Sequence, residues 1–442
     1  MGLMSFGIAS AQQTGEVLTL SINEAIELAL SDNPTVKVAN LEIERYDYVR
    51  KQTISSLYPS VDVSGQYSLA IRRQEMAQGF SFGGKNTFNV GGSVALPLFV
   101  PAIYEQLKMT RTQMESAVES ARATRIDMVA SVRSAYYNVL LAEQSLSVLK
   151  EAIATTEKVV ENTKKLYENG LASEYDYLTA EVQLSNLKPQ VLQTENAIGL
   201  TKLQLKMYLS IPEGVDIAVV GTLDDFRDQV LLNEDYSYDI EDNTTVRSLD
   251  IQAKMLKHQE RLIQSSRMPS IAAFGQISYI GQERVDLSGL MGGGMPRAAA
   301  GEQSKFWWQA PISVGAQISI PIFAGFKKTN QLHEVRNQMA QLNIQREYAE
   351  QGVRLQIEQA INTLLTARET MLSNELTVQQ AEKAYNISLT RYNAGAGTIL
   401  ELNSSQLSLT QAQLSYSQSI YDYLSAYASY EKALGKEYSV EE

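Results

Sequence analysis

The feature that most constrains this chain of 442 residues is the stretch 312–322, in which apolar and small or polar side chains alternate. A period of two is the pattern of a β-strand with one apolar and one polar face. The pattern recurs at residues 61–72 and 89–98, and less regularly at 271–282. Each stretch has about ten residues or more, the length that a tilted strand needs to cross a membrane. The sequence therefore predicts four amphipathic membrane strands.

Four strands are too few to close a membrane barrel. The smallest membrane barrels use about eight strands, and an open sheet edge in lipid leaves backbone groups unpaired. We therefore expect other copies of the chain to supply the missing strands, in a cyclic oligomer with one shared barrel. A dimer would give about eight strands and a trimer about twelve, and only the larger barrel leaves an obvious water-filled bore.

Two long segments, about 102–167 and 327–392, keep a helical pattern, and Gly352 is the only obvious weak point in them. Such a helix would extend roughly 100 Å. Asn169-Gly170 and Ala394-Gly395 follow these segments, and Gly favours the left-handed cap at which a helix reverses. In the helix that follows the second turn, apolar residues at spacings of three or four predict a coiled-coil seam at 409–434. Gln406, Ser417 and similar residues lie off this seam and predict a broad polar face. Such a helix suits a single-layer helical wall with water on both sides.

Internal repetition divides the chain into two similar parts. Thr35-Val36-Lys37 recurs as Thr245-Val246-Arg247, and Leu96-Pro97-Leu98-Phe99 as Ile320-Pro321-Ile322-Phe323. We expect Pro212–Asp239, which separates the parts, to form a short strand and loop. The predicted division is residues 12–223 (β-hairpin insert 60–99, helical hairpin 101–210), a linker at 224–239, residues 240–436 (β-hairpin insert 270–323, helical hairpin 327–434) and a tail at 437–442. Residues 1–11 have the pattern of a signal-peptide remnant, and a disordered N-terminus is the alternative.

Composition excludes several functional classes. The net charge is −12 without a run of Lys or Arg, so we expect no nucleic-acid partner. The chain has no Cys and only two His, His258 and His333, in charged helical patterns. No metal site, no cofactor and no enzymatic nucleophile–base pair is predicted.

In these motifs the sequence resembles the TolC family of outer-membrane efflux proteins (outer membrane factors), over nearly the whole chain. The resemblance is carried by LTLSINEAIELALSDNPTVKVA at 18–39, LYPSVDVSG at 57–65, VGGSVALPLF at 90–99 with VGAQISIPIF at 314–323, and RYNAGAGTILELNSSQLSLTQAQ at 391–413. It implies a mainly α fold with membrane β-structure: a homotrimer whose shared 12-stranded barrel, four strands per chain, continues into a long periplasmic helical barrel. It implies a passive exit duct in the outer membrane, engaged by a periplasmic adaptor and an inner-membrane transporter.

The resemblance also assigns candidate site residues. The adaptor would dock at the hairpin tips, on Tyr167, Asn169, Gly170, Arg391, Asn393 and Gly395. For any one of these residues, a role in helix capping alone is an equally good interpretation. A periplasmic gate would include Asp176, Glu401, Tyr392 and Ser404, the last where the family has a second acid. The family links the position of Asp176 to that of Tyr392 by a hydrogen bond, and Gly397 replaces the arginine that assists. The other interpretation of Asp176 and Glu401 is that of first-turn helix acids, which the helix dipole favours.

Trp307 and Trp308, at the mouth of the fourth strand, fit the membrane interface, where outer-membrane lipid begins. The favoured function is therefore the outer-membrane exit duct of a tripartite efflux pump for small molecules. The duct of a type I protein secretion system is an alternative. A structural coiled-coil protein is a weaker alternative, because it leaves the amphipathic strands unexplained.

Overall fold

The computed structural model describes residues 17–72, 74–76, 80–82, 84–231, 238–283 and 305–438. The expected signal remnant at 1–11 and the last four residues of the tail lie outside this range. The chain forms two compact units, one made of Met1–Ile43, Ser116–Asp250 and Ile344–Glu442, and the other of Glu44–Glu115 and Ile251–Asn343. The unit boundaries fall within helices, so the units do not coincide with the sequence repeats.

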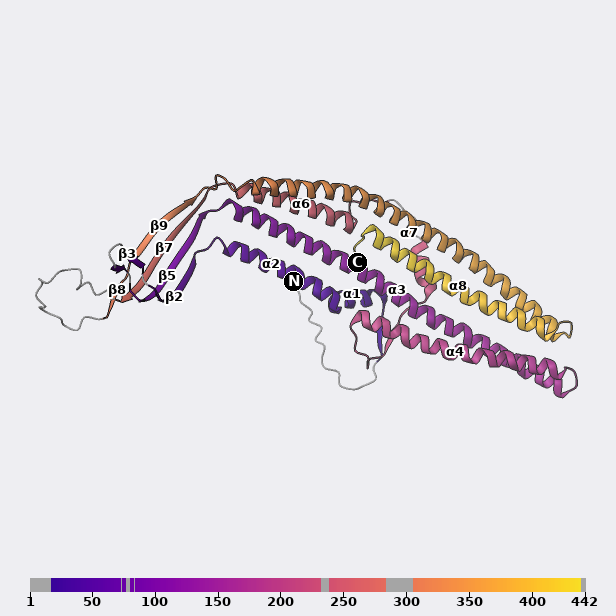
Figure 1. The fold of residues 1–442 in the computed structure, drawn as a ribbon. Helices are drawn as coiled ribbons and strands as arrows, with labels where there is room; N and C mark the ends of the chain where they lie inside the picture. Colours follow the sequence, from indigo (N-terminus) through magenta and orange to yellow (C-terminus); the bar gives the residue numbers. More distant parts are fainter. Residues whose placement is uncertain are drawn as a thin grey trace, which may run out of the picture. The chain divides into compact units, whose positions relative to one another are not determined.

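The second unit contains an antiparallel sheet (Figure 1). Its order is β2–β5–β7–β9, with β8 paired to the far end of β7. The strands are β2 (Ser60–Leu69), β5 (Asn86–Phe99), β7 (Ser270–Glu283), β8 (Phe306–Gln309) and β9 (Ile312–Ser319). The fourth predicted strand is thus shorter than expected and ends at Ser319, because Pro321 has no N–H to donate to a ladder. A small hairpin, β3 (Gln74–Met76) and β4 (Phe80–Phe82), lies between β2 and β5 in the sequence.

The register of the sheet brings the predicted apolar positions onto one face. Val61 pairs with Val94, Val90 with Tyr279, and Ile277 with Ile312, and residues paired across strands share a face. The large side chains of this face are exposed, for example Val63 at 79% and Val314 at 83%. The prediction of four two-faced strands is confirmed. In the described residues of a single chain, an apolar surface spans all four strands.

Most residues of the chain lie in helices. They are α1 (Ile22–Asp32), α2 (Pro34–Ser55), α3 (Pro101–Glu168), α4 (Glu174–Leu209), α5 (Leu223–Leu231), α6 (Thr244–Ser265), α7 (Lys327–Asn393) and α8 (Ile399–Leu434). Ser21 and Glu24 form a capping box at the start of α1. The linker prediction needs correction, because α5 occupies part of the segment that was expected to be loop. The short strand expected there exists: β6 (Ile217–Val219) pairs in parallel with β1 (Leu18–Leu20).

Two asparagines have the same role at equivalent places in the first unit. Asn33 accepts a hydrogen bond from Thr35 N at the start of α2, and its Nδ2 donates to Tyr208 O near the end of α4, at 2.8 Å each. Asn243 does the same for α6 and α8, with Thr245 N (2.9 Å) and Ala433 O (2.8 Å). Each asparagine thereby caps one helix and satisfies a terminal carbonyl of another.

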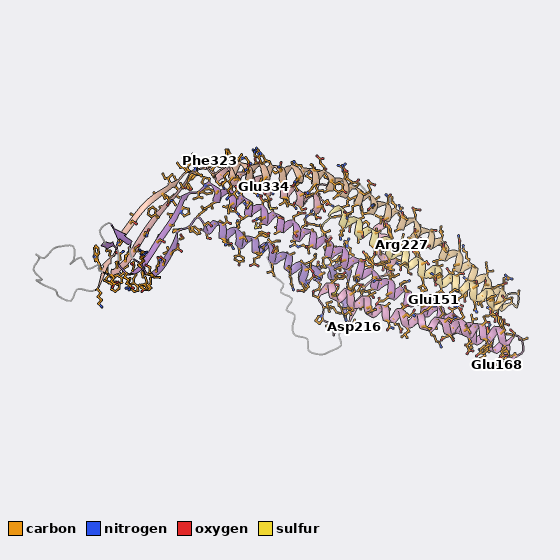
Figure 2. The ribbon with its side chains drawn as sticks, viewed as in Figure 1. Glu151, Glu168, Asp216, Arg227, Phe323 and Glu334 are labelled. Atoms are coloured by element: carbon orange, nitrogen blue, oxygen red, sulfur yellow. The ribbon has the colours of Figure 1, made fainter. Side chains whose placement is uncertain are left out.

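The first unit contains both large clusters of buried apolar side chains. The larger cluster includes much of the predicted seam of α8, and Ile420, Tyr423 and Tyr430 are buried in it. The prediction of a water-exposed polar face on α8 is wrong for Gln406 and Ser417, which are both buried. Among the described residues, Arg227 (Figure 2) joins α5 to this helix through the Tyr416 hydroxyl and also pairs with Asp224.

In the part of the chain that the structure describes, no helix combines the length and apolar character needed to span a membrane.

Candidate functional site

The turn between α3 and α4 forms the first hairpin tip, at the end of α3 marked by Glu168 in Figure 2. Gly170 has φ 72°, and the N–H of Leu171 donates to Leu166 O at 2.8 Å, which is a Schellman closure. Asn169 Nδ2 donates to Lys165 O at 2.7 Å. Tyr167 stacks on a second tyrosine, Tyr177, with centroids 6.1 Å apart. The predicted left-handed glycine cap is confirmed here.

The second tip, between α7 and α8, is built in the same way. Gly395 has φ 71°, and Ala396 N donates to Arg391 O at 2.8 Å. The Arg391 guanidinium also donates a hydrogen bond to Ala396 O at 3.1 Å. Asn393 is exposed at the end of α7. Most of the predicted docking residues are therefore exposed around two matching turns, and several of them also cap the helices.

The two predicted gate acids occupy the same position in their helices, the third residue of α4 and of α8. Asp176 accepts hydrogen bonds from the Oγ (2.6 Å) and N (3.1 Å) of Ser173, in a capping box. Glu401 donates its N–H to Thr398 Oγ1, and its carboxylate lies 3.6 Å from the Arg391 guanidinium. Each carboxylate thus has its partner within its own hairpin, and both acids lie in the first turn of their helices.

The hydrogen bond expected between Asp176 and Tyr392 does not form in this chain. The Tyr392 hydroxyl lies 2.8 Å from Thr163 Oγ1, on α3. Thr163 is fully buried and Tyr392 is half-buried, so this bond, which joins the α7–α8 hairpin to the α3–α4 hairpin, is partly shielded from water. The family's assisting arginine is replaced by Gly397, where an added Cβ would lie 3.1 Å from Tyr392 N, a tight contact.

A second buried contact joins the hairpins further along the same helices. Gln406 Nε2 donates to Ala152 O (3.1 Å) and to Thr156 Oγ1 (2.7 Å) on α3. A small apolar cluster that contains Val159 and Leu402 packs between these polar contacts and the tips. We call Thr163–Tyr392 and Thr156–Gln406 the buried polar pairs of the hairpins. Sequence reasoning missed them, although Thr156 and Thr163 stand one heptad apart on one face of α3.

Three other candidate residues lie elsewhere. Ser404 is exposed on α8, and its carbonyl accepts a hydrogen bond from Ser408 Oγ at 2.9 Å. Trp307 and Trp308 lie on β8 in the sheet unit, both exposed. Trp308 stacks on Tyr279 at 4.8 Å and covers Gly281, where an added Cβ would clash with the ring. Among the described residues, no group of three or more His, Asp or Glu could hold a metal ion.

Comparison with protein families supplies the identity of this arrangement. The model of the family described as "Outer membrane efflux protein" matches residues 25–209 and 244–436, which is most of the chain and both helical hairpins. The chain belongs to the outer membrane efflux protein family. Membership places the protein in the outer membrane as an efflux channel component and not an enzyme, as the sequence analysis predicts.

Individual relatives of this efflux protein agree with the family. The probable efflux pump outer membrane protein TtgC of Pseudomonas putida is 23% identical over 424 residues, 94% of this chain and 83% of the relative. The outer membrane protein TolC of Vibrio cholerae is 19% identical and covers 98% of the chain and 93% of its own length. A crystal structure of CusC, described as forming a transmembrane channel, has a TM-score of 0.73 at 16% identity, over 97% of this chain and 96% of that one.

Proposed function

We propose that three copies of this chain form the outer-membrane exit duct of a tripartite efflux pump that exports small molecules. The observation that carries the proposal is the sheet of the second unit, whose apolar face is uncovered over four strands. Its outer strands β2 and β9 pair only with β5 and β7 respectively among the described residues, so each keeps one free edge. A surface of this kind is stable in lipid only when its backbone edges are paired.

A closed barrel made of several copies satisfies both requirements. In it, β2 of one chain would pair with β9 of the next, and the apolar face would contact lipid all round. Three copies would supply about twelve strands, enough for a water-filled bore, whereas about eight strands leave an interior that is filled by side chains. The homotrimer with a shared twelve-stranded barrel is therefore the assembly that we favour. Trp307 and Trp308, exposed on β8, would lie at the membrane interface of this barrel.

Matching helix lengths and helix caps support two tandem repeats in the chain. α3 and α7 have 68 and 67 residues, and α4 and α8 have 36 residues each. Asn33 and Asn243 join the helices of each part in the same way. These equivalences support a division at 12–223 and 240–436, with helix α5 occupying the first part of the linker at 224–239. Two similar hairpins per chain would give a helical barrel of six hairpins in the trimer.

The hairpin tips are the proposed contact site for a periplasmic adaptor, which would couple the duct to an inner-membrane transporter. Gly170 and Gly395 hold the two turns in matching shapes, so an adaptor would meet the same backbone geometry at both tips. The exposed side chains that it would contact include Tyr167, Arg391 and Asn393.

The proposed entrance constriction lies near the same tips. Asp176 and Glu401 would provide six carboxylates in the trimer, which would favour cations in the pore. Ser404, one turn after Glu401 on α8, would add a neutral polar group. The buried polar pairs would hold the hairpins together in the closed entrance, in place of a bond between Asp176 and Tyr392.

Single-channel conductance in planar bilayers tests the duct and the constriction together. We expect a channel of small conductance and cation preference, and both Asp176→Asn and Glu401→Gln to reduce that preference. Glu174→Gln, an exposed acid in the same first turn as Asp176, is the matched control that should leave selectivity unchanged. If the protein forms no channel, the duct proposal fails. If the three variants behave alike, the acids are helix-capping residues only.

Type I protein secretion remains the alternative function for the same duct. Expression in a strain that lacks its own outer-membrane channel separates the two functions, because efflux restores resistance to small toxic molecules and secretion restores an exported protein. We expect resistance to be restored. Restoration of protein export alone would favour the alternative.

A further inference from the structure

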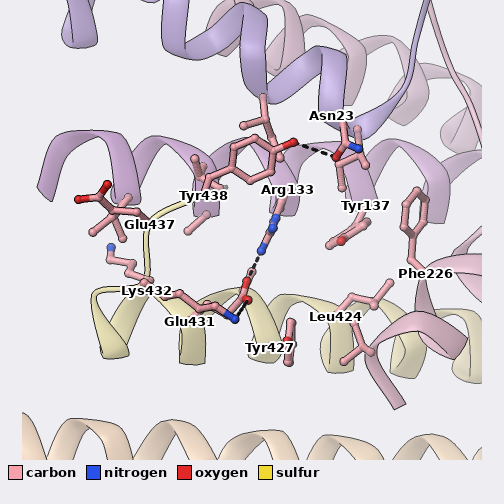
Figure 3. Close-up of a pocket in the computed structure, with 18 residues that line it drawn as sticks. Asn23, Arg133, Tyr137, Phe226, Leu424, Tyr427, Glu431, Lys432, Glu437 and Tyr438 are labelled. Carbon is pink, nitrogen blue, oxygen red and sulfur yellow. Dashed lines mark hydrogen bonds and ion pairs between the residues drawn. The ribbon is translucent and has the colours of Figure 1, made fainter. Parts of the chain in front are cut away.

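A pocket in the first unit has no part in the proposed duct. It has a volume of about 550 Å³, within the range of sites for drug-sized molecules, and lies between α1, α3, α5, α8 and the segment after α8 (Figure 3). The apolar residues that line it include Ile26, Val129, Phe226 and Leu424. The segment after Gly435 forms one wall: Tyr438 donates to Asn23 Oδ1 at 3.0 Å, and its ring lies 5.9 Å from the Arg133 guanidinium.

One side chain that lines the pocket, Tyr137, presents its hydroxyl to the pocket. Tyr137 is only 6% exposed, and its ring packs against Phe226 with centroids 5.4 Å apart. Figure 3 shows the side chain pointing into the pocket, toward the Arg133–Glu431 pair. Among the described residues, no group accepts or donates a hydrogen bond at this hydroxyl. Burial raises the pKa of Tyr137 to about 12, so the hydroxyl is a neutral donor at physiological pH.

Arg133 adds further donors beside Tyr137. Its Nη1 pairs with Glu431, and in the described part of the chain its other nitrogens have no hydrogen-bond partner. A guanidinium has five N–H donors in a planar fork, which matches a carboxylate or sulfonate. Lys432 and Lys436 also line the pocket; Lys432 pairs with Asp127 at 3.0 Å and Lys436 with Glu431 at 3.5 Å. Three cations, Arg133, Lys432 and Lys436, thus balance three acids, Asp127, Glu431 and Glu437, in a chain whose net charge is −12.

We propose that this pocket binds a small amphipathic anion. The apolar body would lie on the floor between α1, α3 and α5. A carboxylate or sulfonate would accept hydrogen bonds from Tyr137 and from the free side of the Arg133 guanidinium. The bound anion would connect the segment after α8 to α1 and α3, because all three contribute to the walls. The pocket lies within one unit of one chain, so the proposal does not depend on the duct.

The test uses 2-naphthoate as the probe and 2-naphthamide as its uncharged analogue. Binding to the full chain in lipid nanodiscs is measured by calorimetry, with empty nanodiscs subtracted. We expect the carboxylate to bind at least tenfold more tightly than the amide. Tyr137→Phe removes one hydrogen bond and should weaken binding of the carboxylate about threefold to tenfold. Ala130→Trp, which fills the pocket from α3, should abolish binding.

The charge contribution needs a matched pair of variants. Lys436→Gln removes a cation of the pocket wall and should weaken carboxylate binding twofold or more. Arg125→Gln removes a cation from the same unit, on the exposed side of α3 where Arg125 bonds Asn40, and should change nothing. Equal binding of carboxylate and amide, or full binding to both Tyr137→Phe and Lys436→Gln, would overturn the proposal. These two variants decide the matter even if Ala130→Trp fails to fold.

Discussion

Removing the hydrogen bond between Thr163 and Tyr392 should open the entrance of the proposed channel more often. Thr163→Val keeps the shape of a fully buried side chain and removes its hydroxyl, which leaves the Tyr392 hydroxyl without this partner. A neutral hydrogen bond contributes about 1 kcal/mol. If the three copies of the proposed trimer open together, the closed entrance loses about 3 kcal/mol, and the ratio of open to closed channels rises roughly a hundredfold.

Single-channel recordings measure this ratio directly. Thr390→Val is the matched control, because Thr390 is exposed near the same tip and its hydroxyl bonds only to Asn386 O of its own helix. Tyr392→Phe should open the channel to a similar degree, and the double variant should open it no further, since both changes remove the same bond. Open probability equal to that of the control, or full additivity of the two changes, would refute the role of this bond.

Three further predictions concern stability. Asn243→Ala removes the cap of α6 and the bond to Ala433 O and should lower the free energy of unfolding by about 1–2 kcal/mol, measured by thermal denaturation against the exposed-site variant Asn393→Ala. Gly395→Ala places a Cβ on a residue with φ 71° and should cost about 1 kcal/mol or more; a neutral result would contradict the turn geometry. Burial acts to raise the pKa of Glu105, but the hydrogen bond and charge of Lys108, together with His258 and Arg261, outweigh it, so the pKa is lowered. Its contribution is therefore present at neutral pH and lost as pH falls below the ordinary glutamate value toward the lowered one. Glu105→Gln should flatten the stability–pH curve in that acid window, and an unchanged curve would exclude this effect.

The sequence was most informative where a pattern repeats over many residues. Strict alternation at 312–319 and helical periodicity through α3 and α7 identify the elements, because each pattern is set by the geometry of one element and needs no knowledge of its neighbours. The glycine turns were equally clear, since a positive φ at Gly170 and Gly395 is a local requirement.

Features that depend on a neighbouring element could not be predicted from the pattern alone. Gln406 is a typical surface residue, and it is buried because Thr156 and a backbone carbonyl on α3 satisfy its amide. The short strand β6 was expected, but its partner was not, because β6 pairs with β1, a three-residue strand about 200 residues earlier in the sequence. Helix α5, of nine residues, was missed for a related reason, since its acidic sequence suggested a loop.

The same reasoning explains the gate. Asp176 and Tyr392 were expected to bond each other from the resemblance, yet each has a nearer partner. Ser173 stands three residues before Asp176 and closes a capping box, which is a local interaction. The partner of Tyr392 lies on another helix, and its choice of Thr163 depends on the packing of the two hairpins.

The mass of the detergent-solubilised protein tests the central claim most directly, namely that an uncovered, open-edged sheet obliges identical chains to close it. Light scattering on the purified protein, corrected for bound detergent, should give about three times the chain mass of 49.0 kDa. A folded particle of one chain mass that stays in solution without detergent would contradict the account.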